Sequence, residues 1–151
     1  MNPADGGLSE DMETEANTVR EQPMSTRDKA MLCVSEALEC KALDLVLLDV
    51  TGLSSVTDYF LIGSGKSSRQ VQGIADNLET RLAKLRIKPL GIEGRVDGHW
   101  ILMDYADVVV HIFYEPVRYF YDLESLWSDA KRVIWSRSAV IPEREMDEDD
   151  I

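Results

Sequence analysis

Apolar residues recur with helical spacing in three stretches of the chain. The clearest begins after Ser67 or Ser68, and its apolar stripe consists of Val71, Ile74, Ala75, Leu78, Leu82 and Leu85. An earlier helix begins at Ser25 or Thr26, either of which can cap the first turn, and its stripe consists of Ala30, Val34, Ala37 and Leu38. A third stripe predicts a last helix before Pro142 and consists of Phe120, Leu123, Trp127, Ala130 and Ile134.

Between these helices lie short apolar runs of strand length. Residues 45–50 and 58–62 predict two adjacent strands, and residues 88–94 predict a weaker one. Residues 100–105 and 108–114 are separated by only two residues, a gap that suits a tight antiparallel hairpin. The order of elements predicts an α/β fold, a mixed β-sheet of about five strands with helices packed on it.

Negative charge is concentrated at the two ends of the chain. The formal net charge is −12 over 151 residues, yet residues 25–141 carry 16 acidic and 14 basic side chains. Residues 1–24 and 142–151 are acidic and poor in large apolar residues, so we expect two disordered tails around one domain at 25–141. A nearly neutral domain argues against broad phosphate neutralisation, so little direct RNA contact is expected.

Composition also disfavours membrane and metal functions. No apolar segment approaches the roughly 20 residues that cross a bilayer, and no signal or transit composition is seen, so a cytoplasmic location without membrane contact is expected. Cys33 and Cys40 are too far apart along a helix for a disulfide. Because His99 and His111 are the only histidines and no metal-ligand spacing occurs, neither a metal nor a cofactor is expected.

The glycine-rich turn GSGKSS at residues 63–68 lies where phosphates bind, between a strand and a helix. A P-loop would need a glycine at position 60, which is Phe60, and a dinucleotide fingerprint would need one at Ser68. We interpret the segment as a strand-to-helix turn capped by Ser67 or Ser68. A nucleotide-binding or nucleotidyltransferase enzyme using this turn with the hairpin aspartates is the alternative hypothesis.

The segment WILMDYADVVVHIFYEP at residues 100–116 holds two aspartates and a histidine in an apolar run. Asp104, Asp107 and His111 could supply a general base or bind a metal, but no nucleophile or third carboxylate lies nearby in sequence. Aspartates at a hairpin more often stabilise the turn. Strand alternation places Trp100 and Leu102 on the same face as Asp104. That face is either a protein interface or a surface that helices bury as core.

Four segments together resemble the ribosomal silencing factor family, also called the Iojap-like family. They are TDYFLIGSGKSSRQVQGIAD at 57–76, GIEG at 91–94, WILMDYADVVVHIF at 100–113 and RYFYDLESLW at 118–127. The resemblance implies a nucleotidyltransferase-like fold without catalytic residues and a non-enzymatic protein. It further implies binding to large-subunit ribosomal protein L-fourteen, which blocks joining of the small subunit and represses translation when nutrients are scarce.

The same resemblance implies a set of partner-binding residues in and after the hairpin. They are Trp100, Leu102, Asp104, Tyr105, Asp107, His111, Arg118 and Tyr121. Trp100, Leu102 and Tyr105 are expected to be apolar anchors, although alternation places Tyr105 opposite Trp100 unless the strand twists. Asp104 and Asp107 are expected to accept hydrogen bonds from the partner. A homodimer that occludes the same face is compatible with this function.

Two positions depart from the family's pattern. Ala106 stands where the family usually has glycine, so a positive φ there would cost about 1 kcal/mol and could reshape the hairpin tip. Gly73 lies in a helix where alanine is usual, at a similar cost.

Overall fold

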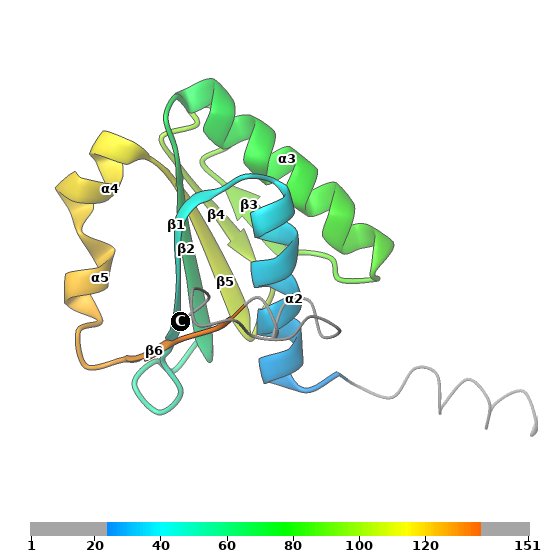
Figure 1. Cartoon of the computed structure of the whole chain (residues 1–151), viewed down its shortest axis with the longest axis vertical. Helices are drawn as coiled ribbons and strands as arrows, with labels where there is room; N and C mark the ends of the chain where they lie inside the picture. The colour runs from blue at the N-terminus through cyan, green and yellow to red at the C-terminus, as the bar shows by residue number, and fades with distance from the viewer. Residues whose placement is uncertain (1–23, 137–151) are drawn as a thin grey trace, which may run out of the picture.

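The computed structural model describes residues 24–136, in which one β-sheet carries helices on both faces (Figure 1). In chain order the elements are α2 (Thr26–Glu39), β1 (Leu43–Asp49), β2 (Tyr59–Gly65), α3 (Ser68–Lys84), β3 (Gly91–Glu93), β4 (Trp100–Asp104), β5 (Val108–Tyr114), α4 (Glu115–Tyr121), α5 (Leu123–Leu126) and β6 (Lys131–Val133). Apart from Met24, the two predicted tails lie outside the described residues.

The sheet is mixed, with the strand order β3-β4-β5-β2-β1-β6. The central pair β2–β5 is parallel, with Tyr59 opposite Val108, and every other neighbouring pair is antiparallel. The predicted pairing of β1 with β2 and the predicted β4–β5 hairpin are both confirmed. The α/β class is also confirmed, with one strand more than the roughly five expected.

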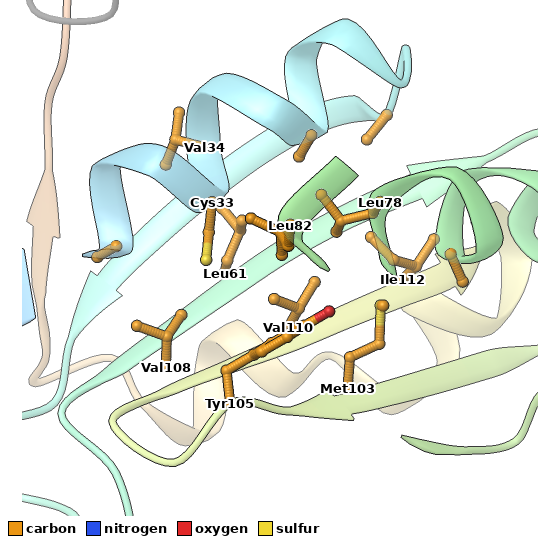
Figure 2. Close-up of a cluster of buried hydrophobic side chains, with 14 of the residues drawn as sticks. Cys33, Val34, Leu61, Leu78, Leu82, Met103, Tyr105, Val108, Val110 and Ile112 are labelled. Carbon is orange, nitrogen blue, oxygen red and sulfur yellow. The ribbon is translucent and has the colours of Figure 1, made fainter. Parts of the chain in front are cut away.

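The larger core lies between the sheet and the layer formed by α2 and α3 (Figures 1 and 2). Helix α3 buries Val71, Ile74, Ala75, Leu78 and Leu82, which confirms the predicted stripe up to Leu82. Both helices begin with the predicted serine caps. Ser25 accepts a hydrogen bond from the backbone N–H of Asp28, and Ser67 accepts one from that of Gln70.

Helices α4 and α5 pack over part of the opposite face of the sheet (Figure 1). Here Phe60, Ile62 and Phe113 form a second, smaller cluster of buried apolar side chains. Leu123 and Trp127 pack against this cluster from the segment that follows α4. The face that includes Trp100 is therefore covered only in part.

The prediction of one last helix, with an apolar stripe from Phe120 to Ile134, is wrong. Asp122 has φ 47° and ψ 53°, and this left-handed conformation ends α4 and separates it from the four-residue α5. Residues Lys131–Val133 then form β6, in which Val133 pairs with Leu47 at the edge of the sheet. Because this pairing is long-range, the helical spacing of nearby apolar residues could not indicate it.

Candidate partner-binding face

The outer face of strand β4 alternates as predicted. Trp100, Leu102 and Asp104 are half-buried, whereas Ile101 and Met103 between them are fully buried beneath α2 and α3. Trp100 and Leu102 are partly buried and pack against the smaller cluster. Of the two alternatives for this face, interface or core, the structure gives an intermediate: apolar side chains that are packed on one side and accessible on the other.

The indole of Trp100 is held by aromatic neighbours. Its ring stacks on Phe113, with centroids 4.8 Å apart and an interplanar angle of 30°. The ring of Tyr121 lies 5.0 Å away, and the indole Nε1–H donates a hydrogen bond of 3.0 Å to Nδ1 of His111. The tryptophan therefore has a fixed orientation in the isolated protein.

Beside Trp100, a groove of about 470 Å³ opens between α4 and the loop that precedes β4. Its lining comprises Gly94, Asp97, His99, Trp100, Pro116, Val117, Phe120 and Tyr121. Phe120 is 81% exposed and Tyr121 is 52% exposed, which is unusual for such large apolar rings. An accessible aromatic groove with a few polar groups at its margin is typical of a protein-binding surface.

At the other end of β4, the hairpin tip is acidic and internally bonded. Asp104 accepts a 2.8 Å hydrogen bond from the backbone N–H of Ala106, whose φ is 73°. Asp107 accepts hydrogen bonds from Nζ of Lys29 at 2.7 Å and from Oγ1 of Thr26 at 3.1 Å. Burial favours a higher pKa for the Asp107 carboxyl, but the hydrogen bonds and charge supplied chiefly by Lys29 lower that pKa.

A second depression, of about 550 Å³, borders this tip. Its lining comprises Ser54, Ser55, Val56, Thr57, Asp58, Leu90, Asp104, Ala106 and Asp107. The Asp107 carboxylate forms an ion pair with Lys29 of α2, whereas Asp104 accepts a backbone hydrogen bond within the hairpin. Of the two carboxylates, Asp104 is therefore the more available to accept a hydrogen bond from a partner.

Tyr105 is not where a surface anchor would be. Its ring is 1% exposed and lies in the larger core, in the same cluster as Cys33, Leu82 and Val110 (Figure 2). Strict alternation along β4 holds, so this ring faces α2 and α3 rather than the side of Trp100. The expectation that Tyr105 is an accessible anchor is corrected on this ground.

His111 and Arg118 are also buried. His111 is 4% exposed, and burial lowers the pKa of its imidazole to about 4 because the charged form would lose hydration. Arg118 is 8% exposed and donates hydrogen bonds to Ser64 at 2.7 Å and to Glu124 at 3.0 Å. Direct contact with a partner was expected of both residues; the structure instead gives them internal hydrogen-bond partners.

The glycine-rich turn has a packing explanation. A Cβ at Gly63 would lie 2.9 Å from Cδ2 of Leu45, and one at Gly65 would lie 3.0 Å from Cγ2 of Val71, so neighbouring side chains leave little room for a Cβ at either position. At the start of α3, the Ser67 hydroxyl accepts a hydrogen bond from the backbone N–H of Gln70, and the side-chain oxygen of Gln70 accepts one from the backbone N–H of Lys66. Two of the N–H groups that a phosphate would use are therefore already bonded.

Within residues 24–136, no group of three or more His, Cys, Asp or Glu side chains could hold a metal ion. Cys33 and Cys40 are both free, as their spacing predicted. Among the same residues, no helix is long and apolar enough to cross a membrane.

Two features of this face were not predicted from the sequence: the groove beside Trp100 and the hydrogen bond from Lys29 to Asp107. The run YFY at residues 119–121 signals exposed aromatics, because three successive rings in a helix cannot all face the core. Lys29 carries no comparable signal, since its contact with Asp107 spans 78 positions in the sequence.

The described domain belongs to the class of mixed α/β proteins, and one face of its sheet carries half-covered aromatic side chains. The family model described as "Ribosomal silencing factor during starvation" matches residues 23–150. The chain belongs to this family, as the four sequence segments indicated.

Curated relatives and solved structures agree with this assignment. "Ribosomal silencing factor RsfS" of Halalkalibacterium halodurans is 39% identical over 110 residues, which cover 73% of this chain and 94% of that protein. "Mitochondrial assembly of ribosomal large subunit protein 1" of Mus musculus is 30% identical over 100 residues, covering 64% of this chain and 44% of the mouse protein. A crystal structure of a Chromobacterium violaceum protein aligns with a TM-score of 0.67 at 32% identity, covering 70% and 88% of the two chains.

Proposed function

We propose that this protein binds the large ribosomal subunit through ribosomal protein L-fourteen and sterically blocks joining of the small subunit, without catalysing a reaction. Under nutrient limitation this would repress translation. The observation that carries the proposal is the half-exposed Trp100 on a sheet face that α4 and α5 leave partly open. Family membership supports the ribosome as the partner.

The contact is proposed to extend along β4. Its apolar centre would consist of Trp100, Leu102 and Tyr121, because these three side chains are partly accessible on the same side of the sheet. Asp104 would accept a hydrogen bond from a basic side chain or a backbone N–H at the edge of the contact. Asp107 would support this edge indirectly, because its carboxylate holds the tip against α2.

The experiment compares the wild-type chain with Trp100→Ala in co-sedimentation with purified large subunits and in a subunit-joining assay. We expect the variant to lose binding and inhibition together, by roughly tenfold or more, as for a central aromatic anchor. Leu85→Ala is the matched control, since Leu85 is an exposed apolar residue at the end of α3 on the opposite layer. Full inhibition by a folded Trp100→Ala protein would refute this contact.

A further inference from the structure

The indole N–H of Trp100 is used inside the protein. Its acceptor, Nδ1 of His111, lies 3.0 Å away on the neighbouring strand β5. A tryptophan at a protein interface commonly offers this N–H to the partner as a hydrogen-bond donor. Here the donor is already satisfied and the ring stacks on Phe113, so only the remaining accessible carbon surface of the indole is left for an outside contact.

The acceptor is rigidly held. His111 lies in the middle of β5, opposite Leu102, and its side chain is 4% exposed. The ring of Phe60 meets the imidazole edge to face at 5.1 Å, and Phe113 lies nearly parallel to it at 6.2 Å. Because Nδ1 accepts a hydrogen bond from the indole N–H, the neutral imidazole carries its own proton on Nε2, which is buried and has no hydrogen-bond partner among the described residues.

We propose that His111 is a positioning residue, which fixes the Trp100 indole by accepting its N–H and thereby restricts the partner to an apolar contact with that ring. The proposal rests on the proposed function, because it concerns the same face. It identifies the chemistry of the partner at this point: an aliphatic side chain or the apolar stem of a basic one, and not a hydrogen-bond acceptor. Binding is strengthened because the ring is ordered before the partner arrives.

The first test uses the free protein. His111→Phe keeps a ring but removes the acceptor, whereas His111→Asn keeps an acceptor oxygen at the δ1 position. In ¹⁵N-resolved spectra, the Trp100 indole signal, assigned by its loss in Trp100→Phe, is expected to exchange slowly in wild type and in His111→Asn. It is expected to exchange quickly in His111→Phe. Equal protection in all three folded proteins would overturn the positioning role.

The second test measures affinity for the large subunit. Losing one neutral hydrogen bond that orients the ring should weaken binding by about fivefold in His111→Phe, with binding largely retained in His111→Asn. In a Trp100→Phe background, which lacks the N–H, the His111→Phe change should have no further effect. An equal loss in that background, or in His111→Asn, would show that His111 acts by another route and would overturn the proposal.

Failure of the two ideas can be told apart. If the wild-type chain does not bind the large subunit, the proposed function fails, while the exchange measurement still decides whether His111 orders Trp100. If His111→Phe overpacks the sheet and does not fold, His111→Leu removes the acceptor with a smaller side chain and takes its place in both tests.

Discussion

The left-handed backbone at Ala106 makes a quantitative prediction about stability. Its φ of 73° is a conformation in which a Cβ crowds the following carbonyl oxygen, and its side chain is exposed. Ala106→Gly removes that crowding and gives up almost no buried surface. The backbone N–H that Asp104 accepts is present in both proteins, so the turn itself is unchanged.

Two opposing contributions set the size of the effect. Relief of the left-handed conformation stabilises the folded state by about 1 to 2 kcal/mol. The greater freedom of glycine in the unfolded chain offsets about 0.5 to 1 kcal/mol of this. Around the middle of both ranges, the net expectation is a gain of about 0.5 to 1 kcal/mol in the free energy of unfolding.

The assay is urea unfolding followed by circular dichroism. With a slope of about 2 kcal/mol per molar urea, the midpoint should rise by about 0.3 to 0.5 M. Ala83→Gly is the matched control: it is the same substitution at an exposed position in the last turn of α3, where the midpoint should fall instead. A lower midpoint for Ala106→Gly, in parallel with the control, would refute the strain argument.

Three further predictions follow from the described contacts. Gly73→Ala in α3 should raise the free energy of unfolding by about 1 kcal/mol, because the added Cβ meets no atom within 4 Å; unchanged urea midpoints would contradict this. Stability should fall by about 2 kcal/mol between about pH 7.5 and about pH 5, because His111 has a pKa near 6.5 when unfolded and about 4 when folded, so the unfolded chain binds the extra proton. In His111→Phe this contribution to the pH profile should vanish, and a slope identical to wild type would contradict the assignment. Lys29→Met should lower stability by about 1 kcal/mol and let the pKa of Asp107 rise toward its ordinary value, measurable by NMR titration of the carboxyl carbon.

Elements defined by local signals were predictable from the sequence. The caps Ser25 and Ser67, the stripe of α3 and the β4–β5 hairpin all depend on residues within a few positions of one another. Strand β6 was not predictable, because it exists only through pairing with β1, far earlier in the chain. Asp122 was not recognised as a helix end either, since a left-handed aspartate has no distinctive neighbour pattern.

The face of Trp100 was predictable from alternation, but the roles of its charged neighbours were not. Polar residues such as His111 and Arg118 suggest exposure by their type alone. In the structure, His111 is bonded to Trp100, and Arg118 is bonded to Ser64 and Glu124. These partners come from separate elements that meet only in the folded protein. For Tyr105, strand alternation correctly predicted a side chain on the face opposite Trp100, whereas the family resemblance suggested an accessible anchor.

The parallel pairing of β2 with β5 affects how the chain can fold. β2 cannot gain this neighbour until α3, β3 and β4 have been made, because all of them lie between the two strands in sequence. Pairings of this kind slow folding, since a long loop must close before any contact compensates for the lost entropy. During synthesis, Leu61 and Ile62 of β2 would therefore remain unpaired with Val110 and His111 of β5 until residue 114 has left the ribosome. A nascent chain ending before that point should remain protease-sensitive, even though it already contains α2, β1, β2 and α3.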